Sequence, residues 1–488
     1  MEINRPSRLL VFTLFFTAFS PFSLPTGLWG QTTDRLPEAD LAGNPATLPW
    51  KAFTFKSDLD ASDIQAEFQE ASGQAVFSYL SPASSPKKVF ARPASATLAG
   101  NCGAWNSFFC INVPSILPVA GSVSNMAVHT YINSFKVSWA YQNTQDQDDL
   151  YVYSLEFDSQ MNFLTSSNTK ILDFIIYQNK DTGPILTFRP PAFLALDPSG
   201  RPHIALVMED GSDRPTLHYI SPDATPSTPC DDDPSPFQCE IIDSSLSSIY
   251  ANQALEITGS YSPRILYQGN DSFQHKTFTR IAYPQSNSLY HPNCGPFSNS
   301  WRCVNITETA YGNSPLSMDV GPNNRPAFAY VNTDNSSSKA AVWVASFVGS
   351  EGNCGEDYRI LSASPFTIGT DNLWDCRQVG VIGSLPSYKS LSLKVDPDNF
   401  PVVAYNSSNG LSFDLKLAYP LARIGQPGSG WTSIKVDGTA LIDTGHYVSL
   451  AIGKAGRGFL AYVEEEDYSP NLKIAYQVLR AFLPLLRR

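Results

Sequence analysis

A repeated unit is the feature that most constrains how this chain can fold. An apolar strand, a short turn and a second strand ending in Ala-Tyr or a near variant recur about every 60 to 70 residues. The best copies begin at Phe193, Leu391 and Ser449. A repeat of this period and content predicts an all-β fold, a β-propeller in which each repeat forms one blade of four antiparallel strands.

Seven such units fit the sequence. Their first strands are expected to start near Ser62, Ser124, Ala192, Gln253, Pro315, Ser390 and Val448. In the sixth unit we expect strands over 390–395, 401–405, 413–419 and 431–436. The seventh unit supplies three strands and ends at Tyr476, whereas residues 50–55 resemble the fourth strand of unit six. We therefore predict that this N-terminal strand completes the last blade, because an open ring would leave an exposed sheet edge.

The two ends of the chain differ in composition from the repeats. Residues 1–30 carry Arg5 and Arg8 before an apolar run that is too short to cross a bilayer, as in a secretory signal peptide. Residues 31–47 are expected to be a linker and 48–478 the propeller. The tail, 479–488, is apolar and basic; a sorting or anchoring role and an extra strand or frayed end both remain open. These features predict a secreted or cell-surface protein with no membrane span in the mature chain.

The cysteines agree with export. All eight fall into close pairs: Cys102 with Cys110, Cys230 with Cys239, Cys294 with Cys303, and Cys354 with Cys376. No pair has the Cys-x-x-Cys spacing of a zinc or redox site. Each second cysteine begins an apolar strand, so we predict four local disulfides that fasten the loop before it. Closing loops of this size contributes roughly 2–3 kcal/mol each.

The repeat consensus also supports a family resemblance. It reads Ser-Leu-Ala-Leu-Asp-x-x-Gly-x-Pro-x-Ile-Ala-Tyr, followed by Leu-Lys-x-Ala-Tyr and a disulfide segment Asn-Cys-Gly…Trp-x-Cys. This pattern resembles the repeats of large secreted bacterial β-propeller proteins of unknown function. The resemblance covers nearly the whole mature chain and is best over 192–306 and 388–476. It implies the fold and does not imply an activity, because propellers host lectins, hydrolases, lyases and docking scaffolds.

Sequence motifs for catalysis are scarce. The chain has no Gly-x-Ser-x-Gly elbow, His-Glu-x-x-His, phosphate-binding loop or zinc spacing. It also lacks the repeated Ser-x-Asp-x-Gly-x-Thr-Trp boxes and arginine triad of sialidase-type propellers, which weakens a glycosidase interpretation. The six histidines are scattered, and His203 and His218 lie within expected strands. We interpret them as strand residues rather than ligands.

Acidic loops are the most suggestive binding feature. The loops between second and third strands are expected on the face that propellers usually use for binding, and five of six carry carboxylates. The candidate ligand or metal residues are Asp146, Asp148, Asp149, Glu209, Asp210, Asp213, Asp271, Asp334, Glu464, Glu465 and Asp467. Hard oxygen ligands of this kind suit Ca²⁺ or a sugar. The alternative is that these loops are simply polar surface that keeps the protein soluble.

These observations favour binding over catalysis. We expect a secreted, non-catalytic propeller whose partner is a glycan or an extracellular protein, with Ca²⁺ as a possible cofactor. A net charge of −12 argues against nucleic acid or an anionic membrane as the main partner. Two alternatives stay open. One is an extracellular hydrolase or lyase that uses carboxylates at the mouth of the central channel; the other is a structural surface module.

Overall fold

The computed structural model describes residues 49–477 outside a set of segments, most of which are loops. The segments outside the description are 58, 60, 70–72, 82–86, 95–98, 104–105, 113–124, 132–133, 144–148, 159–161, 173–186, 210–213, 224–235, 272–275, 285–293, 295–300, 338, 358–369, 384–389, 409, 422–429, 440, 455 and 467–468. The predicted signal peptide, linker and C-terminal tail therefore lie outside the described residues. In the described part of the chain, no helix is long and apolar enough to span a membrane.

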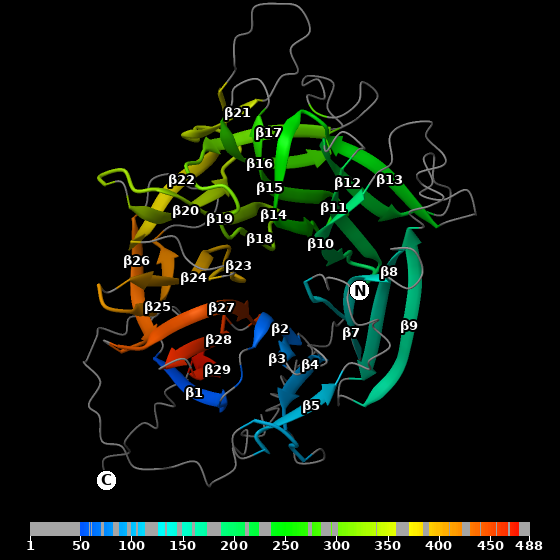
Figure 1. Cartoon of the computed structure of the whole chain (residues 1–488), viewed down its shortest axis with the longest axis vertical. Helices are drawn as coiled ribbons and strands as arrows, with labels where there is room; N and C mark the ends of the chain where they lie inside the picture. The colour runs from blue at the N-terminus through cyan, green and yellow to red at the C-terminus, as the bar shows by residue number, and fades with distance from the viewer. Residues whose placement is uncertain are drawn as a thin grey trace, which may run out of the picture. The chain divides into compact units, whose positions relative to one another are not determined.

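The described strands form seven antiparallel four-stranded sheets arranged in a ring, the predicted seven-bladed β-propeller (Figure 1). Blade 1 contains β2 (Ser62–Gln69), β3 (Gln74–Ser81), β4 (Lys87–Pro93) and β5 (Phe108–Asn112). Blade 2 contains β6 (Ala127–Thr130), β7 (Ser134–Asn143), β8 (Asp149–Asp158) and β9 (Phe163–Leu172). Blade 3 contains β10 (Thr187–Leu196), β11 (Pro202–Glu209), β12 (Pro215–Pro222) and β13 (Phe237–Asp243).

The remaining four blades follow the same order. Blade 4 contains β14 (Leu246–Ile257), β15 (Pro263–Asp271), β16 (Thr277–Pro284) and β17 (Trp301–Glu308). Blade 5 contains β18 (Ser317–Val320), β19 (Pro326–Thr333), β20 (Ala340–Phe347) and β22 (Thr370–Gly383). Blade 6 contains β23 (Leu391–Val395), β24 (Pro401–Ser408), β25 (Phe413–Pro420) and β26 (Trp431–Asp437). Blade 7 contains β27 (Asp443–Ile452), β28 (Gly458–Glu466), β29 (Ser469–Gln477) and β1 (Trp50–Lys56).

Ring closure by the N-terminal strand is confirmed. Strand β1 pairs antiparallel with β29, with Trp50 opposite Gln477. The buried side chains of the described residues form a cluster between each pair of adjacent blades, including blades 7 and 1. Phe55 of β1 belongs to the cluster between blades 7 and 1, so β1 completes a sheet and also fills a core.

Two details differ from the sequence-based expectation. Strands β10, β14 and β27 begin earlier than predicted because the pairing shifts register before the consensus segment, as between Ile249 and Gln253. Such irregularities break the strict alternation on which a strand prediction depends. A further strand, β21 (Cys354–Asp357), pairs with both β17 and β22 and joins the outer edges of blades 4 and 5.

Three of the four predicted disulfides are present: Cys102–Cys110, Cys294–Cys303 and Cys354–Cys376. Cys239 is also disulfide-bonded, and Cys230 lies outside the described residues. The bonded cysteines of the outer strands are Cys110 in β5, Cys239 in β13, Cys303 in β17 and Cys376 in β22. Disulfides therefore hold the outermost strands of four blades, and in three of them the described crosslink is local.

The serine that opens the consensus has a structural role. Its hydroxyl accepts a hydrogen bond from the backbone N–H of the first strand of the next blade. Ser317 accepts from Leu393 at 2.8 Å, Ser392 accepts from Leu450 at 3.0 Å, and Ser449 accepts from Ala66 at 2.9 Å. In two other blades a side-chain amide oxygen takes the place of the hydroxyl: Gln65 accepts from the N–H of Met126, and Asn125 accepts from the N–H of Leu194. These bonds connect the inner strands around the axis of the ring.

Candidate functional site

The first strand of every blade carries one position, two residues after the place of this serine, that is either alanine or a charged residue. The consensus residue is alanine, and Ala127, Ala195 and Ala451 occupy the position in blades 2, 3 and 7. Blades 1, 4, 5 and 6 carry Glu67, Glu256, Asp319 and Lys394 there. We call these four residues the axial cluster. The charges of Asp319, Lys394 and Glu67 all act on Glu256, although Glu67 stands three blades away, so the four side chains lie near one another on the inner side of the ring.

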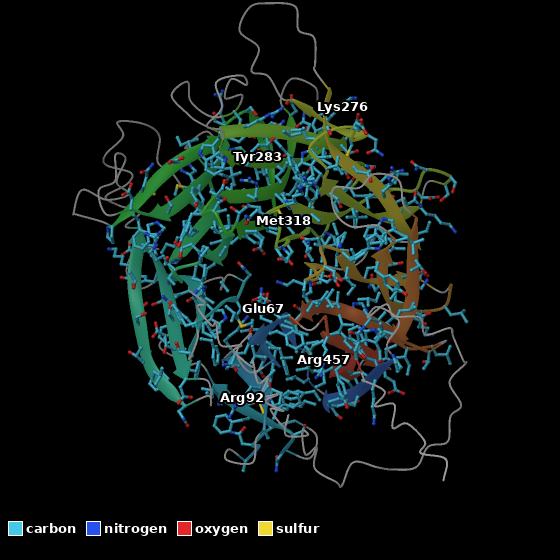
Figure 2. All side chains as sticks on the ribbon, turned by 180° about the vertical axis from the view of Figure 1, so that it is seen from behind. Glu67, Arg92, Lys276, Tyr283, Met318 and Arg457 are labelled. Carbon is cyan, nitrogen blue, oxygen red and sulfur yellow. A yellow bond between two sulfur atoms is a disulfide. The ribbon has the colours of Figure 1, made fainter. Side chains whose placement is uncertain are left out.

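One ion pair anchors the axial cluster. The Nζ of Lys394 lies 2.5 Å from Oε1 of Glu67, and the two side chains are 20% and 33% exposed. Blade 7 stands between the two strands, and its small Ala451 leaves room for the pair. Figure 2 shows Glu67 on the inner side of the ring. Both groups are surrounded by protein yet reached by solvent, which is the situation of a ligand-binding group.

The other two carboxyl groups make the cluster electrostatically unfavourable. Burial and then the charge of Asp319 raise the pKa of Glu256 to about 8, so this side chain holds a proton at neutral pH. Burial also raises the pKa of Glu67, although the ammonium of Lys394 opposes the shift. Burial by itself would lower the pKa of Lys394, but Glu67, Asp319 and Glu256 together hold it above its ordinary value. The cluster thus combines a proton donor, an ammonium and carboxylate acceptors.

Asp319 is fixed in place by the backbone of the neighbouring blade. Its carboxylate accepts a hydrogen bond from the N–H of Val395 at 2.7 Å. This contact links blade 5 to blade 6 one residue beyond Lys394. A carboxylate held in this way costs little side-chain entropy when it accepts a further bond from a ligand.

The hairpin turns between first and second strands form a bonded rim close to the axial cluster. The exposed ring of Tyr261 in blade 4 lies 6.0 Å from the Arg201 guanidinium, and its hydroxyl is 3.0 Å from the Ser199 hydroxyl of blade 3. Asn324 of blade 5 accepts from the N–H of Gly259 in the turn of blade 4 at 2.9 Å. Glu256 precedes this turn by only a few residues, so the exposed aromatic ring of Tyr261 closely follows an axial position along the chain.

The predicted loop carboxylates that the structure describes are not part of the axial cluster. Of those described, Asp149, Glu209, Asp271, Asp334 and Glu464 are buried and Glu465 is exposed. Asp146, Asp148, Asp210, Asp213 and Asp467 lie outside the described residues. Among the described residues, no group of three or more His, Cys, Asp and Glu side chains is arranged to hold a metal ion. A calcium or sugar site in these loops stays a prediction.

The buried loop carboxylates serve their own or adjacent strands. Asp149 pairs with Lys170 at 2.7 Å, and Glu464 pairs with Lys473 at 2.7 Å. Asp334 accepts hydrogen bonds from Ser337, Ser336 and Gln378, which lower its pKa to about 2. The sequence pattern could not show Lys170, Lys473 and Gln378 as partners, because they lie on strands whose register it does not specify.

The axial cluster was not among the predicted site residues, although a signal for it exists. At the third position of Ser-Leu-Ala-Leu-Asp, four of seven repeats replace alanine with an acidic or basic residue. Charged residues are rare on strands that line a packed ring, and four of them at one repeat position mark a shared location.

His203 and His218 lie within strands, as expected from the sequence, and the structure shows that both are buried. The His203 ring lies 2.5 Å from the hydroxyl of Tyr219 and 3.5 Å from the carboxylate of Asp197, and His218 lies 2.7 Å from the hydroxyl of Thr216. Burial lowers the pKa of each histidine to about 4; at His203, Asp197 partly opposes it. Neither ring is reached by solvent as a ligand site would be.

These histidines predict acid sensitivity. The unfolded chain takes up a proton at each ring near pH 6.5, whereas the folded protein does not until about pH 4. The contribution of the two histidines to stability is therefore level above pH 6.5 and falls as the pH drops towards 4, by at most about 3 kcal/mol per ring. Urea unfolding at pH 7 and pH 4.5 measures this loss. The H218Q variant should lose less stability than the wild type between the two pH values; an equal loss would contradict the assignment.

No protein-family model and no curated protein match this chain. Solved structures similar to it include a Trypanosoma rangeli sialidase in complex with the inhibitor DANA, at 8% identity and a TM-score of 0.41, over 88% of this chain and 60% of the sialidase. They also include the polysaccharide lyase Uly1, at 8% identity and a TM-score of 0.45, over 85% of this chain and 89% of the lyase. The Hadza microbial sialidase Hz136 matches at 10% identity and a TM-score of 0.37, over 77% of this chain and 72% of that one. Such low scores leave the function to be argued from the residues of this chain.

Proposed function

We propose that this protein is a secreted or cell-surface, non-catalytic propeller that binds a glycan through the axial cluster. One observation carries the proposal: four blades each direct a charged side chain to the axis, where solvent reaches the two that form the ion pair. The disulfides support an oxidising, extracellular location. A glycan is one of the two partner classes expected from the sequence; the other is an extracellular protein.

A purely structural role explains the cluster poorly. The ion pair of Lys394 with Glu67 would need no further carboxyl groups, yet Glu256 and Asp319 are placed beside it. Glu256 keeps its proton only because the site disfavours its charge, which costs stability as the pH rises from 4.5 towards 8. Three blades show that alanine suffices at this position. Groups kept at a cost in stability are typical of functional sites.

The chemistry of the cluster suits sugar hydroxyl groups. A hydroxyl both donates and accepts, so it can bridge the ammonium of Lys394 or the protonated Glu256 to the carboxylate of Asp319. The exposed ring of Tyr261 on the nearby rim offers an apolar surface for the face of a sugar ring. Polar groups that converge beside an aromatic ring provide orientation and affinity together.

Glycan-array binding of the purified protein, with calcium and with EDTA, tests the proposal. We expect discrete binding that E256A and D319A each weaken about tenfold or more, since each removes one hydrogen-bonding partner of the sugar. The matched control is E308A, because Glu308 pairs with Lys276 in an exposed ion pair on blade 4. If both axial variants bound the glycan as strongly as the wild type, the axial cluster would not be the binding site, and the acidic loops would become the candidate site again. A blank array would overturn the glycan proposal in favour of a protein partner or a structural module.

The raised pKa of Glu256 also supports a second candidate, a polysaccharide hydrolase or lyase. A carboxyl group that is protonated at neutral pH beside a carboxylate is the arrangement of a general acid with its partner. In that case the protein would release reducing ends or unsaturated products from a polysaccharide. Activity would fall as the pH rises past about 8 and would be lost in E256Q. Binding without product release would exclude this candidate.

A further inference from the structure

Arg92 in blade 1 is a buried cation with unused hydrogen-bond donors. The residue is only 2% exposed. Its Nε and Nη2 atoms are both buried, and neither has a hydrogen-bond partner among the residues that the structure describes. Arginine keeps its charge at any ordinary pH, so it cannot relieve this situation by losing a proton. A buried charge with unpaired donors costs free energy, and in a native protein it points to a partner that the chain itself does not supply.

The repeat shows that a blade can be built without an arginine at this position. Arg92 follows Ala91 and precedes Pro93 at the end of β4, where the third-strand consensus Leu-Lys-x-Ala-Tyr has its tyrosine. The corresponding residues of blades 3 to 7, none of them charged, are Ser221, Tyr283, Ser346, Tyr419 and Tyr476. A neutral side chain therefore suffices for the fold, and the charge of Arg92 needs another explanation.

Arg92 faces blade 2. Phe90, two residues earlier on the same face of β4, stacks on Phe157 of β8 with 5.5 Å between ring centroids. Burial lowers the pKa of Arg92, and the charge of Asp158, the residue after Phe157, partly opposes this shift. These two described residues form no ion pair with each other, and the Asp158 carboxylate accepts two hydrogen bonds from Asn162 at 2.8 Å. The nearest acid therefore leaves the guanidinium unpaired.

A second unused donor lies beside Arg92. Phe109 of β5 is opposite Arg92 in the sheet, and Ser107 stands two residues before Phe109. The backbone carbonyl of Ser107 accepts a hydrogen bond from the N–H of Ala94 at 2.8 Å, so the pairing continues past Arg92. The Oγ of Ser107 is buried and has no hydrogen-bond partner in the described part of the chain. Because alternate residues share one face, this hydroxyl lies on the same side of the sheet as Arg92.

The beginning of β9 connects this place to solvent. The ring of Phe163 packs edge-to-face against Phe157, with 6.2 Å between centroids, and Phe163 is 57% exposed. Leu164 beside it is 54% exposed. Exposed apolar side chains close to a buried charged group provide the apolar wall and the polar anchor of a typical ligand site.

The unused edge of Arg92 indicates which ligand would fit. The N–H of Nε and one N–H of Nη2 run parallel along one edge of the planar guanidinium, and this pair matches the two oxygens of a carboxylate. A carboxylate carries a single negative charge, so it neutralises the arginine and leaves no net charge buried. A sulfate carries two, and Asp158 would repel the second.

We propose that Arg92 anchors a binding site between blades 1 and 2 that takes the carboxylate group of a small ligand. Nε and Nη2 hold the two oxygens, and the hydroxyl of Ser107 donates to one of them. Figure 2 shows Arg92 farther from the centre of the ring than Glu67. The site is therefore separate from the axial cluster and does not depend on the proposed function.

Thermal unfolding in acetate, D-glucuronate, sulfate and chloride at matched ionic strength tests the proposal. The R92Y variant installs the consensus tyrosine, and without a carboxylate it should melt no lower than the wild type because it removes a buried unpaired charge. General salt effects act on both proteins alike, so the difference between them measures binding at this site. We expect both carboxylates to raise the melting temperature of the wild type saturably, by about 3 °C or more relative to R92Y.

Two further variants keep the test sharp if R92Y folds poorly. S107A removes only the second donor and should weaken acetate binding about fivefold. The matched control is R457Y, because Arg457 is an exposed arginine of blade 7, and it should keep the full shift. A response to glucuronate at lower concentrations than to acetate would support an acidic sugar as the source of the carboxylate, and equal responses would support a small organic acid.

Three results would overturn the proposal. The first is a shift that is equal in the wild type and R92Y, which would make Arg92 a structural residue. The second is a shift that R457Y loses as R92Y does, which would indicate unspecific binding of anions. The third is a shift that depends on Arg92 but is larger in sulfate than in acetate, which would exclude a carboxylate as the preferred ligand.

Discussion

Deletion of residues 48–56 is expected to abolish stable folding, or to lower the melting temperature by far more than any surface change. Strand β1 supplies the fourth strand of blade 7, and its loss exposes the edge of β29. It also removes Phe55, which is 1% exposed and packs edge-to-face against Phe77 and Phe108 of blade 1, with 5.1 Å between ring centroids in each case. The deletion therefore opens the ring at both its sheet and its core.

The point variant F55A separates these two effects. It keeps the backbone pairing of β1 and should cost about 3–5 kcal/mol, a large part of the 5–15 kcal/mol that stabilises a typical protein. K51A is the control, because Lys51 is exposed on the same strand and should lose little. Calorimetry and light scattering on heating compare the three variants. An unchanged melting curve for the deletion, or equal losses for F55A and K51A, would contradict closure by β1.

The fold could be predicted largely because propeller blades are specified locally. In unit six, expected strands at 390–395, 401–405, 413–419 and 431–436 correspond to observed strands at 391–395, 401–408, 413–420 and 431–437. Alternating apolar residues and the Asp-Pro-Asp-Asn turn are enough to specify these elements. Pairing of β1 with β29 also followed from sequence, since a unit that lacks one strand requires a partner from elsewhere in the chain.

The axial cluster could not be predicted in the same way. Glu67 and Lys394 are separated by 327 positions, and their contact depends on the ring bringing blades 6 and 1 to opposite sides of a small alanine on blade 7. Loop composition, in contrast, gave acidic candidates whose neighbours in space were unknown. Asp149 and Glu464 meet lysines of the adjacent strands β9 and β29. Charge alone does not separate a ligand-binding carboxylate from one already neutralised within its sheet.

A second feature that depends on three-dimensional packing is a buried ionic contact between blades 3 and 4. Arg280 of β16 is fully buried, and its Nη1 lies 2.6 Å from Oδ2 of Asp243 at the end of β13. Tyr267 donates to the same Oδ2 at 2.6 Å, and Arg280 donates through Nε to Asn305 at 2.7 Å. Burial opposes ionisation of Asp243, but Arg280 and the hydrogen bonds from Ser245 and Tyr267 keep its pKa below the ordinary value.

A similar arrangement recurs between blades 6 and 7. Tyr462 and Lys473 both donate to Oδ2 of Asp437 at 2.5 Å. Tyr462 is the tyrosine that ends the Ala-Tyr repeat of its blade. Tyr267 in blade 4 and Tyr462 in blade 7 each donate to the last residue of the outer strand in the preceding blade. The repeat thus encodes a blade-to-blade contact that its apolar alternation does not reveal.

Removal of the buried arginine is expected to cost about 3–5 kcal/mol, because R280M leaves the charge of Asp243 buried and without its cation. The cost depends on pH. In the wild type the contribution of Asp243 is present above about pH 4 and is lost as the pH falls through its lowered pKa. In R280M the same carboxyl resists ionisation, so the variant loses stability as the pH rises. The difference between the two proteins should therefore widen from pH 4 to pH 7.

Urea unfolding of the wild type, R280M and the double variant D243N/R280M at pH 4 and pH 7 measures this effect. The double variant should recover much of the loss, because it removes the stranded charge together with its partner. K276M is the matched control: Lys276 pairs with Glu308 on the same blade, but both side chains are about half exposed, so its loss should be at most about 1 kcal/mol. A loss in R280M that does not exceed the control, or that is equal at both pH values, would show that apolar packing alone joins blades 3 and 4.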